Sequence, residues 1–317
     1  MTNAARGALL TVTLNPCIDV EARVPVVEPD HKLHCQALRR APGGGGVNVA
    51  RVATRLGVPA TALVLAGGDN GRLLLSFLAA EGVATEECAT AEATRESLTI
   101  DEDRTGRQFR FVLPGPTVSA EEGADAARRV EQLAHRHRYV VLSGSMPLGL
   151  DAGYLGEMVS RVQRSGAAAV VDTSGPALLH AARAGAALIK PSVNELSGAV
   201  GRPLTTEAEL DEAARELLSA GAGRAVIISM GASGVLLVES GEPMRRIPAP
   251  TVDVVSVIGA GDSLVAGVVV ALLRGETMAA AARFGVAAGT ATVSRSGSAL
   301  CLADDVWNFH ATNAAGE

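Results

Sequence analysis

From about residue 120 onward, strand-length apolar segments alternate regularly with helix-length segments, and this rhythm limits the fold more than any other feature. The spacing predicts helices over 120–136, 151–165 and 206–220. The strands between them are aliphatic throughout: "YVVLSGS", "AAAVVDTS", "ALIKPS" and "AVIISMG". Continuous aliphatic strands separated by helices are typical of a parallel sheet covered on both faces. We therefore expect an α/β fold with a mainly parallel central sheet between two layers of helices.

The last third of the chain departs from this alternation. "GVLLVES" and "MRRIPAP" follow each other without a helix, which predicts antiparallel strands at one edge of the sheet. Two apolar helices, 261–274 and 277–292, then end the predicted pattern.

Two earlier stretches, 19–41 and 95–114, have the short alternating pattern of antiparallel hairpins. No linker rich in Pro, Gly or Ser divides the chain, so we expect a single domain over 1–317 from which both hairpins project. An isolated two-stranded ribbon is marginally stable in water, which favours pairing of the hairpins with a second copy of the chain.

Charge and cysteine usage exclude several classes of protein. The formal net charge of −6 lacks the basic excess of a general nucleic-acid or membrane-surface binder. The four cysteines have no CxxC spacing, which argues for a reducing compartment. No signal peptide is recognisable, and the longest apolar run, 264–273, is about half of what a bilayer requires. We expect a cytoplasmic protein that binds neither nucleic acid nor membrane.

Polar residues follow several of the predicted strands, where open parallel sheets bind ligands. One such residue is usually part of a turn, but five strand ends carry them, which indicates a shared site. These residues are Asn15, Asp19, Ser143, Ser145, Asp172, Lys190, Glu195, Ser229 and Gly231. Of them, Asp172 has the position of a structural acid. Only two of the 28 basic residues are lysines, Lys32 and Lys190, which suggests that a compact ammonium has a role at each place.

The stretch "SVIGAGDSLVAG" sets Asp262 after three small residues and ahead of an apolar helix. Asp262 is explained equally well as a helix cap. The small residues Gly259, Ala260 and Gly261 also leave the backbone amides open to an anion. An acid beside an anion site suits phosphoryl transfer, in which a base takes a hydroxyl proton while amides hold the moving charge.

A second glycine run, Gly43 to Gly46, opens another predicted helix. It is neither GxGxxG nor a P-loop, so it supports neither a dinucleotide nor a Walker site. Glycines at a helix start suit close contact with a polar ligand, and Asn48 can both donate to and accept from hydroxyls.

Four motifs in this order resemble the phosphofructokinase-B group of the ribokinase superfamily: "GGGGVNVARVATRLG", "KPSVNEL", "SMGASG" and "VIGAGDSLVAG". The resemblance extends from "TLNPCIDV" to Cys301. It implies a ribokinase-like three-layer sandwich with a small β lid, formed by the segments near 19–41 and 95–114. In relatives such lids pair across a homodimer.

The resemblance also implies roles at the sugar. Asp262 matches the catalytic base, and Gly259, Ala260 and Gly261 match the anion hole. An Asp stabilised by a helix dipole is expected to be a weak base, which a loose transition state tolerates. Arg95 matches the residue that contacts the phosphate already on the sugar. The remaining substrate positions are Asp19, Lys32, Gly44, Gly45, Asn48 and, at its strand end, Ser143.

For ATP and its ions, the resemblance implies Lys190 beside the phosphates and Glu195 as an organiser of Mg²⁺ through water. Ser192 stands where the family has Asn, which alters the reach toward that water. The nucleotide positions further along are Ser229, Gly231, Gly234, Val286 and Thr290. A loop that holds K⁺ in relatives, largely by carbonyls, corresponds to Ser256, Ile258, Thr292, Arg295 and Gly297.

Together these matches imply an ATP-dependent kinase of a ketohexose phosphate, with fructose 6-phosphate converted to fructose 1,6-bisphosphate. Fructose 1-phosphate and tagatose 6-phosphate are the alternatives within the class. Four plain glycines before Val47, where the fructose 1-phosphate enzymes often carry a lysine, favour the 6-phosphate. A non-catalytic sugar-phosphate sensor is the alternative from another class, and the intact Asp262 and Lys190 argue against it.

Overall fold

The computed structural model describes residues 7–314, and its centre is a nine-stranded sheet. The strand order is β13-β12-β11-β10-β9-β8-β1-β4-β5. Seven strands are parallel: β1 (Gly7–Thr13), β4 (Ala60–Ala66), β5 (Ala84–Ala89), β8 (His137–Ser143), β9 (Ala168–Asp172), β10 (Leu188–Ile189) and β11 (Ala225–Ser229). β12 (Val235–Glu239) and β13 (Arg245–Ile247) are antiparallel. The predicted mainly parallel sheet and its antiparallel edge are confirmed.

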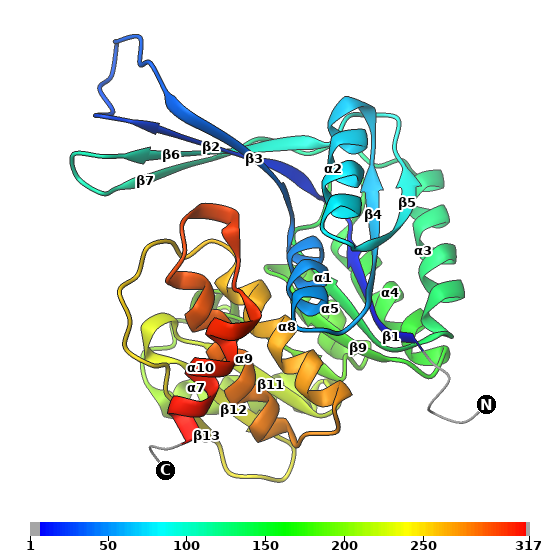
Figure 1. Ribbon diagram of the computed structural model, residues 1–317. Helices are drawn as coiled ribbons and strands as arrows, with labels where there is room; N and C mark the ends of the chain where they lie inside the picture. Colours follow the sequence, from blue (N-terminus) through cyan, green and yellow to red (C-terminus); the bar gives the residue numbers. More distant parts are fainter. Residues whose placement is uncertain (1–6, 315–317) are drawn as a thin grey trace.

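Helices cover both faces of this sheet (Figure 1). One layer holds α1 (Gly45–Arg55), α2 (Gly68–Ala80), α8 (Ala260–Leu273), α9 (Met278–Val293) and α10 (Ala303–Ala314). The other holds α3 (Ala120–Ala134), α4 (Ala152–Arg164), α5 (Pro176–Arg183), α6 (Val193–Val200) and α7 (Glu207–Ser219). Neighbouring strand residues face opposite layers: Leu9 packs in the first core and Leu10 in the second. The prediction that two apolar helices end the chain is wrong, because α10 follows them.

The two predicted hairpins form, but they merge into one four-stranded sheet of order β3-β2-β6-β7. Its strands are β2 (Cys17–Val24), β3 (Gln36–Gly43), β6 (Arg95–Glu102) and β7 (Gln108–Val112), and β2 pairs with β6 in parallel. This projecting sheet extends away from the rest of the molecule (Figure 1). The argument that isolated ribbons need a second chain is therefore wrong, because each ribbon has its partner within the same chain.

The register gives the projecting sheet two different faces. Val20, Leu98 and Phe111 are cross-strand neighbours and share one apolar face. Asp19 and Glu21 lie on the opposite face, where the Glu21 carboxylate accepts a hydrogen bond from the backbone N–H of Ser298 in the loop after α9. The polar face is thus the one turned toward the helices of the main sheet.

Within the described part of the chain, no helix is long and apolar enough to cross a bilayer.

Candidate active site

Two predicted residues meet at the carboxyl ends of neighbouring parallel strands. Asp172 is the last residue of β9, and Lys190 follows β10 directly. Lys190 Nζ lies 3.0 Å from Asp172 Oδ1, and both side chains are nearly buried. Burial alone would lower the pKa of Lys190, but the Asp172 carboxylate raises it above its usual range, so the ammonium stays charged. Sequence analysis assigned Asp172 a structural role and missed this pairing.

Asp262 does not cap its helix. The N-cap of α8 is Gly259, which has a left-handed backbone (φ 72°) and no side chain to accept a hydrogen bond. Asp262 lies one turn inside, partly exposed, and its Oδ2 accepts a hydrogen bond of 2.8 Å from Asn48 Nδ2 of α1. The capping interpretation is therefore wrong, and the carboxylate is held by a residue more than 200 positions away in the chain.

The electrostatic surroundings of Asp262 make it a better base than predicted. Burial raises the pKa of Asp262 to about 7, and the negative charge of Asp172 adds to this effect. The hydrogen bond from Asn48 and the charge of Lys190 oppose it only in part. The expectation of a weak, dipole-stabilised base is wrong, because burial and a neighbouring carboxylate outweigh the helix dipole.

The backbone ahead of Asp262 offers an electropositive site. The first hydrogen bond within α8 runs from Ser263 N to Gly259 O. The Ala260 amide makes only a long contact of 3.4 Å to Val257 O, and within residues 7–314 the Gly261 amide donates to no backbone oxygen. A side chain on Gly261 would place its Cβ 3.5 Å from Lys190 Nζ, so the ammonium lies directly against this turn. Free amides and a buried ammonium together attract an anion.

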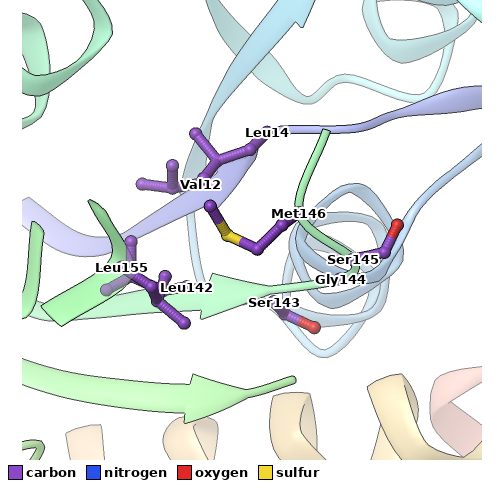
Figure 2. Close-up of a pocket in the computed structure, with 8 residues that line it drawn as sticks. All are labelled: Val12, Leu14, Leu142, Ser143, Gly144, Ser145, Met146 and Leu155. Carbon is purple, nitrogen blue, oxygen red and sulfur yellow. The ribbon is translucent and has the colours of Figure 1, made fainter. Parts of the chain in front are cut away.

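The glycine run at the start of α1 is explained by close packing as well as by access for a ligand. A Cβ on Gly43 would collide with the Asp19 carboxylate, and one on Gly45 with Ser143 Oγ. The Ser143 hydroxyl is buried and has no hydrogen-bond partner within the described residues. Figure 2 shows Ser143 at the end of β8, beside a cavity of about 10 Å³ that has room for at most one water. A contact of Ser143 with sugar stays a prediction.

Three further residues that are predicted to bind the sugar lie near the glycine run at residues 43–46. The Asp19 carboxylate accepts a hydrogen bond from Cys17 Sγ at 3.2 Å, and burial raises the pKa of Asp19. Asn48 is the Asp262 partner described above. Gly44 has a left-handed backbone (φ 112°), and a Cβ there would lie 2.8 Å from Thr13 Cγ2.

Two predicted cations have different surroundings. Arg95 is half-buried at the start of β6 and donates from Nε to Asn15 Oδ1 at 3.1 Å, which orients its guanidinium. Lys32 is exposed in the connection between β2 and β3. The strand from Asp19 to Val24 alone spans roughly 17 Å. The structure therefore does not bring Lys32 close to the other residues of the same chain that are predicted to bind the sugar.

Ser192 and Glu195 are tied to each other at the start of α6. Ser192 is the N-cap, its Oγ accepts from Glu195 N at 3.3 Å, and Glu195 Oε2 accepts from Ser192 N at 2.7 Å. Within residues 7–314, no group of three or more His, Cys, Asp or Glu could hold a metal directly. This donor set would fit Mg²⁺ held by phosphate oxygens and waters, with the Glu195 carboxylate as an acceptor for one of those waters.

A pocket of about 450 Å³ lies beside this capping box, and Ser192, Ser229 and Gly231 are among its lining residues. The Cβ position of Gly231 is open, whereas a Cβ on Gly234 would collide with Ile247 O of β13. Val286 and Thr290 are buried in α9. A nucleotide contact of these residues stays a prediction.

The segments of the predicted potassium loop lie together. Val255 N and Ser256 N both donate to Val293 O, at 2.8 and 3.2 Å. This brings Ser256 and Ile258 against the end of α9, where Thr292 Oγ1 donates to Ser263 Oγ at 2.7 Å. Beyond α9, Arg295 pairs with Asp305 at 3.4 Å, and Gly297 leaves room for the Glu21 carboxylate. These contacts bring residues 255–256 next to the end of α9, and a contact of the loop carbonyls with K⁺ stays a prediction.

Sequence analysis also missed Arg51 and Glu81. Arg51 is 2% exposed on α1 and forms an ion pair of 2.7 Å with Glu81 at the end of α2. The signal was an arginine in the middle of a mostly apolar helical stretch, between Ala50 and Val52.

The site combines a basic carboxylate, a buried ammonium and free helix amides at the carboxyl edge of a parallel sheet. This combination is that of an α/β enzyme of the kinase class. The chain belongs to the pfkB family of carbohydrate kinases, whose family pattern matches residues 11–305. The predicted family and the prediction of a sugar-phosphate kinase are both confirmed.

The relatives agree with this assignment. The chain is 40% identical over 301 residues to ATP-dependent 6-phosphofructokinase isozyme 2 of Mycobacterium tuberculosis, covering 95% of this chain and 88% of that protein. It is 36% identical to 1-phosphofructokinase of Rhodobacter capsulatus, with 88% of each chain covered. The structure of Escherichia coli phosphofructokinase-2 in complex with potassium matches with a TM-score of 0.92 and 36% identity, covering 97% and 99% of the two chains. Arabidopsis thaliana ribokinase, at 18% identity, shares the fold with a TM-score of 0.78 over 96% and 99% of the chains, and the ribokinase-like prediction is confirmed.

Proposed function

We propose that the protein transfers the γ-phosphoryl group of ATP to fructose 6-phosphate, which yields fructose 1,6-bisphosphate and ADP. The observation that carries this proposal is the Asp262 carboxylate, held by Asn48 at 2.8 Å beside the Gly261 turn and Lys190. Similarity to the 6-phosphofructokinase of M. tuberculosis supports the choice of sugar.

In the proposed reaction, Asp262 accepts the proton of the attacking sugar hydroxyl. The hydroxyl oxygen bonds to the γ-phosphorus, the bond to the β-phosphate oxygen breaks, and ADP departs with that electron pair. A base with a pKa of about 7 is well matched to this task at neutral pH. The Asn48 amide has two N–H donors, so one can hold Asp262 while the other holds a substrate hydroxyl.

Charge stabilisation is assigned to Lys190 and to the amides of Gly259, Ala260 and Gly261. These groups face the position where negative charge builds up on the transferred phosphoryl group. Bound Mg²⁺ would neutralise charge on the phosphates, with Glu195 holding one of its waters. The K⁺ complex of the E. coli enzyme supports a role for K⁺ in the loop at Ser256 and Gly297.

We further propose that the chain works as a single unit closed by the projecting sheet as a lid, and that two chains pair through it. The apolar face of this sheet supports pairing, because Phe111 on that face is 50% exposed. Lys32 lies in the connection between β2 and β3 of this sheet, and its contact with sugar phosphate stays a prediction. A cytoplasmic location also stays a prediction.

The specificity for one sugar phosphate rests on the proposed contact with Arg95. Similarity to the R. capsulatus 1-phosphofructokinase keeps fructose 1-phosphate as a second candidate, together with tagatose 6-phosphate.

Initial rates of ADP release with fructose 6-phosphate, fructose 1-phosphate and tagatose 6-phosphate test the proposal. We expect the highest kcat/KM with fructose 6-phosphate. A higher value with either of the other sugars would reassign the substrate. Binding of sugar phosphate without any ADP release would instead identify a sensor.

A further inference from the structure

We propose that Arg51 is a positioning residue that fixes the Asn48 side-chain amide so that its NH₂ group faces Asp262. This inference rests on the proposed role of Asp262 as the base, and it adds a residue that touches neither substrate nor the reacting atoms.

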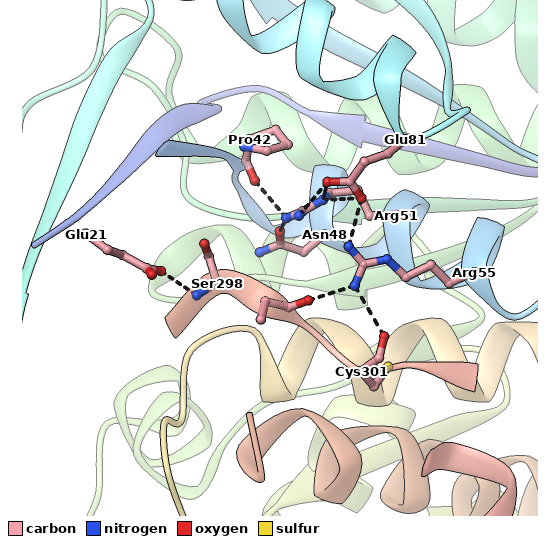
Figure 3. A network of polar contacts seen from close by, with 9 residues as sticks. Glu21, Pro42, Asn48, Arg51, Arg55, Glu81, Ser298 and Cys301 are labelled. Atoms are coloured by element: carbon pink, nitrogen blue, oxygen red, sulfur yellow. Dashed lines mark hydrogen bonds and ion pairs between the residues drawn. The ribbon is translucent and has the colours of Figure 1, made fainter. Parts of the chain in front are cut away.

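Arg51 lies one helical turn after Asn48 on α1, and all three nitrogens of its guanidinium donate hydrogen bonds. Nη1 donates to Asn48 Oδ1 at 3.1 Å and to the Pro42 carbonyl at 2.9 Å. Nε and Nη2 donate to Glu81 Oε1 at 3.0 and 2.7 Å. Figure 3 shows these contacts around Arg51, with Asn48 on one side and Glu81 on the other. An arginine anchored at three sides has little freedom to move.

The chemistry of Arg51 decides which way the amide turns. A guanidinium only donates hydrogen bonds, so the atom of Asn48 that faces it must be the carbonyl oxygen. The NH₂ group then points the other way, and it donates to Asp262 Oδ2 at 2.8 Å. If the amide rotated by half a turn, its oxygen would face the Asp262 carboxylate, where two acceptors repel each other.

The hydrogen bond from Asn48 affects the protonation of Asp262. The charged and titratable groups that face Asp262 are Asp172 and Lys190 from the main sheet and Asp19 from β2, and Asn48 approaches from α1. A hydrogen bond from Asn48 stabilises the ionised carboxylate and lowers the pKa of Asp262 against the larger effect of burial. Without Arg51, this stabilisation weakens and the base is protonated at a higher pH.

A purely structural function for Arg51 is the alternative, because it also joins α1 to α2 through Glu81. Arg55 separates the two explanations. It lies one turn further along α1 and shares Glu81 at 2.9 Å, but it donates to the carbonyls of Ala299 and Cys301 and not to Asn48 (Figure 3). Arg55→Met therefore removes a comparable clamp without touching the amide.

The experiment compares the pH dependence of kcat, with ATP and sugar phosphate saturating, for four variants of the full chain. These are Arg51→Met, Arg55→Met, Asn48→Ala and the double variant Arg51→Met/Asn48→Ala. Loss of a hydrogen bond to a charged group shifts a titration by roughly one to two pH units. We expect Arg51→Met to move the acidic limb of kcat upward by about one pH unit and to lower kcat roughly fivefold at pH 7. KM for the sugar should rise and KM for ATP should not, while Arg55→Met leaves the midpoint in place.

The double variant tests the route through Asn48. If Arg51 acts only through the amide, Arg51→Met produces no further shift in the Asn48→Ala background. An equal shift in both backgrounds, or the same shift in Arg55→Met, would overturn the proposal. If Arg51→Met does not fold by circular dichroism, Arg51→Met/Glu81→Gln serves in its place, because it leaves no unpaired carboxylate where the ion pair was. A midpoint that stays at its wild-type pH in that variant would also overturn the proposal.

Failure of the proposed function has a different signature. If Asp262 is not the base, Asp262→Asn keeps its turnover and the acidic limb of kcat does not depend on Asn48 at all.

Discussion

Asp262 is placed where a negative charge is unfavourable, and this gives it its basicity. Burial and the nearby Asp172 carboxylate both disfavour the ionised form, and the pKa of about 7 results. A group whose pKa is raised in the folded state stabilises the fold at low pH and loses that contribution as the pH rises through its folded pKa. The ionised Asp262 carboxylate therefore reduces the stability of the protein above about pH 7, where it would act as the proposed base.

Asp262→Asn separates these two effects. We expect turnover to fall by roughly 10²–10⁴-fold, because the proton acceptor is lost. We also expect the variant to unfold at a higher temperature than the wild type at pH 8, by roughly 2–4 °C, and the gain to shrink at pH 5, where wild-type Asp262 is protonated. Thermal unfolding at both pH values, together with steady-state rates, checks this. Near-normal turnover would exclude Asp262 as the base.

The guanidinium of Arg95, the proposed contact of the sugar phosphate, is oriented by a hydrogen bond to Asn15. Arg95→Ala is expected to raise KM for the sugar phosphate by roughly 10–100-fold, because a charge-assisted hydrogen bond to phosphate is lost. KM for ATP should stay unchanged. Arg72→Ala, on the exposed face of α2, is the control for general loss of positive charge. An unaltered sugar KM would remove Arg95 from the phosphate site.

At the scale of elements, the start of α1 packs closely against β1 because the glycines there have no side chains. A Cβ on Gly46 would lie 2.7 Å from the Val12 carbonyl oxygen and 2.5 Å from Thr13 Oγ1. Relief of the first contact would require a movement of the β1 backbone. Because α1 carries both Asn48 and Arg51, its distance from β1 also sets the position of the Asp262 partner.

Gly46→Ala should therefore destabilise the protein by roughly 1–3 kcal/mol and lower kcat. Gly198→Ala in α6 is the matched control, because a Cβ there meets nothing within 4 Å and an alanine favours the helix. Denaturant unfolding of both variants gives the comparison. Equal stability of the two would show that α1 can move away from β1.

Elements that depend on local pattern could be predicted from the sequence, whereas contacts between distant elements could not. The aliphatic strands around Val140 and Val170 and the turn at Gly106 follow from periodicity and turn chemistry. The parallel pairing of β2 with β6 joins segments about 80 residues apart, and no local pattern encodes it. The same limit applies to the candidate site: Asp262 could be identified by its motif, but its partner Asn48 and the ion pair of Asp172 with Lys190 are long-range contacts.

At the scale of the whole molecule, the projecting sheet has one polar and one apolar face. Asp19 and Glu21 on the polar face connect it to the glycine turn and to the loop at Ser298. The apolar face is turned the other way and leaves Phe111 half exposed. A second copy of the chain would cover this face, and the closure of the site would then depend on assembly.

Phe111→Asp is expected to convert a dimer into a monomer and to raise KM for the sugar. Val112→Asp is the control, because the neighbouring residue of a strand points to the opposite face and Val112 is 64% exposed there. Light scattering after size-exclusion chromatography gives the masses. A monomeric wild type, or the same loss of mass in both variants, would argue against pairing through the apolar face.

The two lysines of the chain differ sharply in access. The Lys190 amine is 6% exposed and paired with Asp172, whereas Lys32 is exposed in the connection between β2 and β3. An amine-acylating reagent should therefore modify Lys32 in preference to Lys190. A fluorophore attached to Lys32 would sit at the outer end of the projecting sheet, and its emission could follow the movement of that sheet during turnover without an engineered cysteine.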